Sequence, residues 1–162
     1  GIGGSLRYEM PVGDNLGLMF TAGYLAFGGD EVTSGVPGIF ALTVKSSSAL
    51  IPLQVGAKYY FSEQQDGFYG AVQLGLTLIS SSTDITTDFG GTKTTTSATG
   101  SASGFSYAPG IGYHLSVIDI GLNYQLFSQT TTVSDPFTGA SFSATSTGSY
   151  LGLRLAYVFG EK

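Results

Sequence analysis

The ionisable residues of this chain are few, and their types limit the chemistry that it could perform. Charged side chains make up 10% of the 162 residues, with one histidine, His114, and no cysteine. A serine–histidine–acid hydrolase needs a histidine that substrate can reach, and a zinc site needs histidine, thiolate or carboxylate ligands in one cluster. No carboxylate cluster surrounds His114. The sequence therefore predicts no enzyme, no metal site and no cofactor.

A subset of the ionisable residues shares a different property, because these residues occupy one face of segments that alternate in polarity. They are predicted to meet in one layer inside a narrow barrel, near one end, with neutral polar side chains extending the hydrogen bonding around them. The charged members of this predicted layer are Arg7, Glu9, Lys58, His114, Asp119 and Arg154, and the polar ones are Gln54, Gln73, Asn123 and Tyr69. Since an eight-stranded barrel is only wide enough for side chains to fill, a buried ion-pair network is favoured over a gated proton or ion path.

The elements that must position these residues are predicted from hydropathy. About 25% of residues are charged in ordinary soluble domains, so this chain is poor in charge, yet it has no apolar run of the roughly 18 residues that a membrane-spanning helix needs. Two classes remain, a soluble all-β domain and a membrane β-barrel. The net charge of −5 and the pI near 4.5 exclude nucleic acid as a partner, because nucleic-acid binding needs a basic face.

Seven segments alternate with the two-residue period of a β-strand. Each runs about 9 to 11 residues, which matches the roughly 9–11 that a tilted strand needs to cross a bilayer. The segments are 2–10, 16–24, 51–61, 68–78, 105–115, 118–126 and 150–159. Their polar faces are rich in Gly, Ala and Ser and nearly free of Lys and Glu, which indicates a crowded interior rather than a surface in water. The apolar faces are therefore predicted to meet lipid.

Short and long connections alternate between these segments. Short turns are predicted at Pro11–Asn15, Ser62–Gly67 and Ser116–Val117, and long Ser/Thr-rich loops at 29–50, 80–103 and 128–147. Outer-membrane barrels have short periplasmic turns and longer extracellular loops. We therefore expect the short turns and the C-terminus in the periplasm and the long loops outside the cell. A soluble up-and-down meander with uneven loops is the alternative.

Aromatic residues on the apolar faces sort by depth into two groups. One group lies near the short turns or the C-terminus: Tyr8, Tyr59, Phe61, Phe68, Tyr113, Tyr157 and Phe159. The other lies toward the long loops: Tyr24, Phe105, Tyr107 and Tyr124. Rings at headgroup level form such girdles at both membrane interfaces. The two groups are predicted to be lipid-interface girdles.

The strand count is odd, whereas bacterial outer-membrane barrels have an even number with eight as the minimum. We expect the first of eight strands upstream of Gly1, and seven in this chain. Arg7 and Arg154 would flank that strand, so it is predicted to carry an inward Glu or Asp, because an uncompensated buried charge is costly. A weaker alternative is an extra strand at Ile39–Lys45.

Several of these segments resemble a known family. SLRYEMPVGDNLGLMFTAGYL, PLQVGAKYYF, FYGAVQLG, FSYAPGIGYHL, IDIGLNYQ and YLGLRLAYVFG resemble small bacterial outer-membrane β-barrel domains, similar in plan to the eight-stranded OmpA/OmpX-type barrels. The resemblance implies an up-and-down antiparallel barrel with a filled lumen and no catalytic residues. The last segment, Leu151–Phe159, also resembles the C-terminal signal that the barrel-insertion machinery reads.

The sequence thus predicts one domain over 1–162, an all-β transmembrane barrel of the outer membrane with a structural or recognition role. Its expected partners are outer-membrane lipids and lipopolysaccharide, the insertion machinery, and a larger outer-membrane protein complex to which it would be accessory. A small passive diffusion channel and a soluble lipocalin-like ligand-binding barrel remain alternatives.

Overall fold

The computed structural model describes residues 1–36, 38–62, 65–134 and 141–159. These residues form a single antiparallel sheet in which each strand pairs with the next along the chain, and they contain no helix. The strands are β1 (Ile2–Pro11), β2 (Leu16–Val36), β3 (Phe40–Tyr60), β4 (Gly67–Phe89), β5 (Thr92–Leu115), β6 (Ile118–Ser134) and β7 (Ser141–Tyr157). The predicted all-β, up-and-down class is therefore correct.

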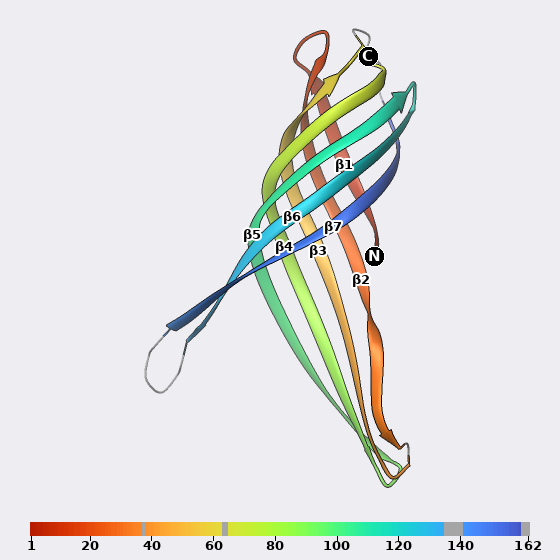
Figure 1. The fold of residues 1–162 in the computed structure, drawn as a ribbon, viewed down its shortest axis with the longest axis vertical. Helices are drawn as coiled ribbons and strands as arrows, with labels where there is room; N and C mark the ends of the chain where they lie inside the picture. The colour runs from red at the N-terminus through yellow and green to blue at the C-terminus, as the bar shows by residue number, and fades with distance from the viewer. Residues whose placement is uncertain (37, 63–64, 135–140, 160–162) are drawn as a thin grey trace.

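The sheet curls around an axis, so that β5, β6 and β7 cross in front of β1, β2 and β3 in Figure 1. We call the concave side of the curled region the lumen. Within the described residues β1 pairs only with β2 and β7 only with β6, so the sheet is not closed. The eighth strand expected upstream of Gly1, and the acidic residue expected on it, stay predictions.

All three short turns lie at one end of the curled sheet, the upper end in Figure 1. They join β1 to β2, β3 to β4, and β5 to β6. Residues 63–64 of the second turn lie outside the described residues. In the third turn Ser116 has a φ of 53°, a left-handed conformation that closes the tight connection between Leu115 and Ile118.

The three predicted long loops are wrong, because strands occupy most of 29–50, 80–103 and 128–147. β3 and β4 pair without interruption from Phe40↔Phe89 to Tyr60↔Tyr69. Ser/Thr-rich composition is typical of loops, but Thr is β-branched and fits a pleated sheet well. The alternative of an extra strand at Ile39–Lys45 is wrong as well, since 40–45 are the far end of β3.

Beyond the curled region the sheet divides into two arms (Figure 1). Pairing of β5 with β6 ends at Gly104↔Gln129, whereas β4 and β5 stay paired to Phe89↔Thr92, and β6 and β7 to Ser134↔Ser141. We call residues 28–36, 40–47, 82–89 and 92–99 the four-stranded arm. The extensions of β6 and β7 form a separate two-stranded arm, which points away from the four-stranded arm (Figure 1).

In the curled region the apolar side chains face outward and the ionic ones face the lumen. Leu74, Ile120 and Leu153 are 46%, 49% and 79% exposed, while Lys58 and Asp119 are 1% and 2% exposed. This arrangement is the reverse of a soluble barrel, where apolar side chains fill the interior. It is the polarity that a sheet surrounded by acyl chains requires.

The two faces exchange polarity where the arms begin. On the outer face of β4, apolar side chains run from Phe68 to Leu78 and give way to Ser80, and on β6 Leu126 gives way to Ser128. On the opposite face of the four-stranded arm, Val44 pairs with Ile85. The apolar outer band on β4 is thus about 11 residues long, as expected for a tilted membrane-crossing strand.

A charged substitution should therefore have opposite consequences at two positions of the same strand and face. Leu74→Arg, in the middle of the apolar band, should destabilise the folded protein by about 2–4 kcal/mol, the cost of Arg near a bilayer midplane. Ser82→Arg, on the same face within the four-stranded arm, should change stability little. Urea unfolding in lipid vesicles measures both, and equal effects would contradict the assigned lipid boundary.

Candidate functional site: the ionic layer of the lumen

Asp119 is the centre of the lumen's ionic layer. Its Oδ2 lies 2.8 Å from Lys58 Nζ, and its Oδ1 accepts hydrogen bonds from the Tyr69 hydroxyl at 2.7 Å and from Arg154 Nη2. The carboxylate is almost fully removed from solvent. Because a buried charge is tolerated only when paired and hydrogen-bonded, these three partners account for an ionised aspartate in this position.

Lys58 extends the layer to a second carboxylate. Its Nζ lies 3.1 Å from Glu9 Oε2, and the Tyr60 hydroxyl donates to Glu9 Oε1 at 2.7 Å. The same ammonium lies 4.6 Å from the centroid of the Tyr60 ring and 4.0 Å from that of Tyr69. Two carboxylates and two aromatic faces thus surround a lysine that is cut off from water, and each interaction offsets its desolvation.

The layer is assembled from strands that are distant along the chain. Glu9 comes from β1, Lys58 from β3, Tyr69 from β4, Asp119 from β6 and Arg154 from β7. All lie near the short-turn end of their strands, so the curl of the sheet brings them to one level. Lys58 and Asp119 are separated by 61 residues.

Two glycines on the lumen wall make room for the central tyrosine. A Cβ on Gly112 would lie 2.3 Å from the Tyr69 hydroxyl oxygen, and one on Gly121 would lie 2.9 Å from it. Such separations are far below van der Waals contact, so no larger residue fits while Tyr69 reaches Asp119. The glycines on the polar faces of β5 and β6 therefore have a packing role.

Arg7 takes part in the polar contacts of the lumen but pairs with no carboxylate among the described residues. Its Nε donates to Thr21 Oγ1 at 3.2 Å, and Thr21 donates in turn to Gln73 Oε1 at 2.7 Å. In a second polar contact, Gln54 Nε2 donates to Ser106 Oγ at 3.1 Å. Gln54 and Gln73 thus extend the polar lumen, but through hydroxyl partners rather than through the ionic layer itself.

His114 is close to the ionic layer without a hydrogen bond to it. The ring is 2% exposed, its Nδ1 lies 3.6 Å from Asp119 Oδ2, and it meets the Tyr60 ring edge-on with centroids 6.2 Å apart. Neither ring nitrogen has a hydrogen-bond partner among the described residues. Asn123 lies against Gly152, where a Cβ would be 2.9 Å from its Oδ1, and it takes no part in the polar contacts described above.

Sequence reasoning missed several lumen residues, of which Tyr60 is the most important. Tyr60 alternates with Tyr59 and Phe61, so its inward position was predictable, but its contact with Glu9 across the lumen was not. Buried residues absent from the predicted set also include Met19, Thr77, Ser106 and Gln125. Their strand parity was the only signal in the sequence.

Apolar and aromatic side chains lie at the other end of the lumen. Phe27 on β2 meets Tyr150 on β7, with ring centroids 5.6 Å apart, and Leu50 is 5% exposed. The ionic layer near the short turns and this aromatic contact thus lie at different levels of the curled sheet.

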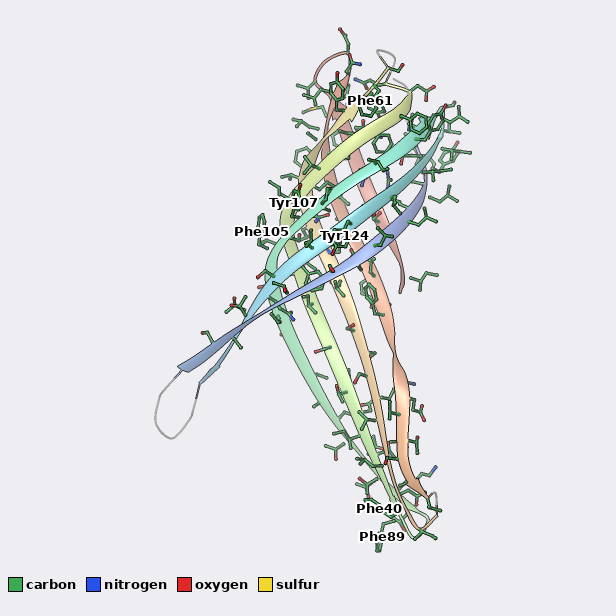
Figure 2. All side chains as sticks on the ribbon, viewed as in Figure 1. Phe40, Phe61, Phe89, Phe105, Tyr107 and Tyr124 are labelled. Atoms are coloured by element: carbon green, nitrogen blue, oxygen red, sulfur yellow. The ribbon has the colours of Figure 1, made fainter. Side chains whose placement is uncertain are left out.

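All eleven aromatics predicted to form girdles are exposed on the outer face. Three edge-to-face pairs form within the group near the short turns: Tyr59–Phe61, Phe68–Tyr113 and Tyr157–Phe159, with centroids 5.8, 4.8 and 4.6 Å apart. Figure 2 shows Phe61 near the short-turn end and Phe105, Tyr107 and Tyr124 near the level where the arms separate. The first group thus lies at the short-turn border of the apolar band, and the second lies farther along the strands, toward the arms.

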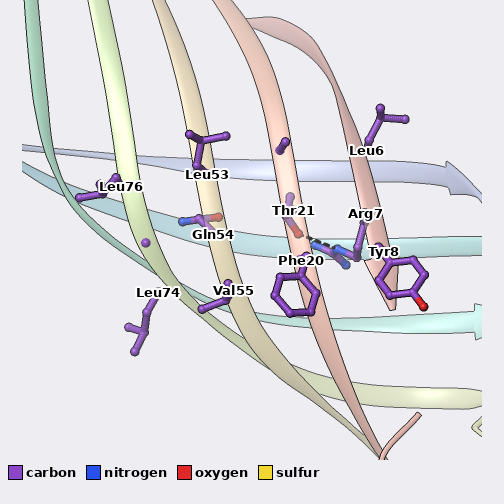
Figure 3. A pocket seen from close by; sticks show the side chains of 12 residues that line it. Leu6, Arg7, Tyr8, Phe20, Thr21, Leu53, Gln54, Val55, Leu74 and Leu76 are labelled. Atoms are coloured by element: carbon purple, nitrogen blue, oxygen red, sulfur yellow. Dashed lines mark hydrogen bonds between the residues drawn. The ribbon is translucent and has the colours of Figure 1, made fainter. Parts of the chain in front are cut away.

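A furrow on the outer face crosses β1 to β4 (Figure 3). One wall is the register row Leu6, Ala22, Leu53 and Leu76, and the other is Tyr8, Phe20, Val55 and Leu74. Its floor is formed by residues such as Thr21 and Gln54, whose side chains form hydrogen bonds inside the lumen. The furrow therefore lies within the outward apolar band, with lumen-facing residues at its floor.

An outward apolar band, aromatic borders and a lumen filled by paired charges define a transmembrane β-barrel. The model of the outer membrane protein beta-barrel domain matches residues 1–131, and the chain belongs to this family. No curated protein and no solved structure matches it significantly. In the described part of the chain, no helix has the length and hydropathy to cross a membrane.

Removing the charge of Asp119 should destabilise the barrel more than any neutral change nearby. Asp119→Asn keeps the side chain's shape but leaves Lys58 and Arg154 buried without their shared counter-charge, so we expect a loss of about 3–5 kcal/mol. Asn123→Ala, on the same strand and face, is the matched control and should cost under about 1 kcal/mol. Urea unfolding followed by tyrosine fluorescence measures both, and a stability of Asp119→Asn equal to the parent's would refute the central role of this carboxylate.

Proposed function

We propose that this protein is a non-enzymatic outer-membrane scaffold whose barrel anchors two rigid β-arms outside the cell for recognition. The observation that carries the proposal is the continuity of the strands: β3, β4 and β5 run without a break in their shared register from the short turns to the tip of the four-stranded arm. The tip of the arm is thus connected to the barrel by paired strands rather than by a loop, so the barrel fixes the position of the tip.

The filled lumen supports an anchoring role over transport. Lys58, Asp119 and Tyr69 meet at the centre, and their partners come from opposite sides of the curled sheet. A diffusion channel would need these groups to separate and remain solvated, which costs the interactions that stabilise their burial.

The outer faces of the arms support exposure to water. Pairs of threonine hydroxyls hydrogen-bond across neighbouring strands, Thr33 with Thr43 at 3.0 Å, Thr86 with Thr95 at 2.9 Å and Thr130 with Thr145 at 3.0 Å. Cross-strand Thr pairs stabilise a sheet without any apolar partner. Rigid arms with polar ladders suit display of a recognition surface above the lipopolysaccharide layer, alone or as an accessory part of a larger outer-membrane complex.

The surroundings of His114 support a role without catalysis. The ring is buried beside Asp119 and Tyr60 in the ionic layer, where neither lipid nor solvent reaches a nucleophile. The proposed partners are outer-membrane lipids and lipopolysaccharide around the apolar band, and the barrel-insertion machinery, which would read the exposed alternation that ends at Phe159.

Conductance measurements test the filled lumen. Purified protein in planar bilayers should give no discrete current steps, because side chains occupy the centre of so narrow a barrel. The mobility shift that folded barrels show in unheated gel samples verifies that the same preparation is folded. Regular single-channel steps from the folded protein would favour the passive-channel alternative and refute the anchoring role.

The absence of cysteine from the chain allows the proposed orientation to be tested one site at a time. A membrane-impermeant maleimide should label Thr94→Cys, in the four-stranded arm, on intact cells. It should label Asp14→Cys, in the first short turn, only after the outer membrane is permeabilised. Both positions are exposed, so the reverse pattern of labelling would show that the arms point into the periplasm.

A further inference from the structure

The far end of the four-stranded arm presents a cluster of large apolar side chains. Val36, Ile39, Phe40 and Phe89 are 59%, 70%, 53% and 72% exposed. Figure 2 shows Phe40 and Phe89 together at the end of the arm farthest from the short turns, and the two residues face each other in the β3–β4 register. We call these four residues the apolar tip.

The apolar tip is held in place by hydrogen bonds between the ends of two hairpins. Gly90 N donates to Ile39 O at 3.1 Å, which joins the β4–β5 turn to the β2–β3 turn. The Asp88 carboxylate accepts from Gly91 N at 3.1 Å and from Gly38 N at 3.4 Å. Asp88 is 9% exposed, so its carboxylate holds the two turns together and is largely hidden from solvent.

The conformation of these turns depends on glycine. Gly38, Gly90 and Gly91 have φ values of 84°, 59° and 83°, in the left-handed region that other residues rarely adopt. The turns are therefore short and specified, and they keep Phe40 and Phe89 side by side. A cluster that is fixed before it binds loses little conformational entropy on binding.

The size and shape of the apolar tip favour a lipid bilayer over a protein partner. With about 150–250 Å² for each aromatic side chain, the exposed parts of the four side chains sum to roughly 400 Å². A standard protein interface takes about 800 Å² from each partner. The four residues lie at the narrow end of the arm (Figure 2), and a bilayer accepts apolar side chains without shape complementarity.

The charge around the apolar tip is compatible with a lipid surface. Asp88 is bonded to two backbone amides, and Lys93, its cross-strand neighbour, places a positive charge beside it. Aromatic side chains favour the interfacial region of a membrane, where ring and headgroup meet. We propose that the apolar tip inserts into the interface of a second lipid bilayer, facing the one that the barrel spans.

This inference rests on the proposed function only in that the arms must lie outside the cell, which the labelling of Thr94→Cys tests separately. The tip's own affinity for lipid is measurable with purified protein held in a nanodisc of ordinary phospholipid. Because the chain contains no tryptophan, Phe89→Trp gives a single fluorescent reporter at the tip. The probe is a vesicle of phosphatidylcholine with brominated acyl chains, which quenches a tryptophan that enters it.

We expect brominated vesicles to shift the emission of Phe89→Trp to the blue and to lower it by roughly twofold, as for a ring that enters the membrane interface. Unbrominated vesicles should give the shift without the quenching. Leu153→Trp, within the nanodisc band, is the control for lipid exchange and should be unaffected. Phe40→Trp provides a second reporter that does not depend on the fold of the β4–β5 turn.

A second set of variants separates the apolar tip from the part of the arm's inner face that lies nearer the barrel. Ile39→Ser in the Phe89→Trp background should reduce the quenching, whereas Val32→Ser, nearer the barrel on the same arm, should leave it unchanged. Unquenched emission from both reporters in folded protein would overturn the inference, as would equal effects of the two serine substitutions. Loss of vesicle binding together with external labelling of Thr94→Cys would leave the scaffold role standing and point to a protein partner instead.

Discussion

A charge that is taken out of water must find its counter-charge, and the structure of this barrel depends on that constraint. Outside the curled sheet there are only acyl chains, so every ionic side chain of the membrane band must face the lumen. There Lys58 meets Glu9 and Asp119, and Arg154 meets Asp119, across distances of tens of residues in sequence. The members of this network come from β1, β3, β6 and β7, so the curl of the sheet and the network depend on each other. The glycines beside Tyr69 leave the space that its ring needs to reach Asp119.

The same strands obey a different constraint once they leave the lipid. Beyond Leu78 and Leu126, in the direction of the arms, the outer face carries Ser and Thr because it meets water. Pairs of hydroxyl groups there replace apolar contacts as the cross-strand interaction. The inner face of the four-stranded arm, no longer enclosing a lumen, becomes free to carry Val32, Val44 and Ile85. β3, β4 and β5 thus pass from one solvent to the other with their pairing unbroken, whereas β2 shifts its register between Gly28 and Glu31, where the arm begins.

In the proposed function, the barrel and the arms have different roles. The barrel gives rigidity and position, since its lumen is occupied by paired charges near the short turns and by Phe27 and Tyr150 at the other level. The arms give reach, since β3, β4 and β5 carry their pairing to the braced turns at Gly38 and Gly90. In the function that we propose, such a protein acts at its exposed ends, and the ionic groups of the lumen stabilise the barrel.

Alternation alone determined which side chains face lipid, which face the lumen and where the short turns fall, because a strand's two-residue period assigns every residue to a face before any contact is made. It also placed Lys58, Asp119 and Arg154 together in one layer of the lumen. Only the tertiary structure determined which lumen residues pair with each other. Arg7 forms a hydrogen bond with Thr21 rather than with an acid, and Tyr60 reaches Glu9, because the curl and register of the sheet set the distances between these side chains. The arms were missed for a related reason, since a Ser/Thr-rich segment becomes a strand or a loop according to the neighbour beside it. That neighbour lies far away in sequence, and the fold alone supplies it.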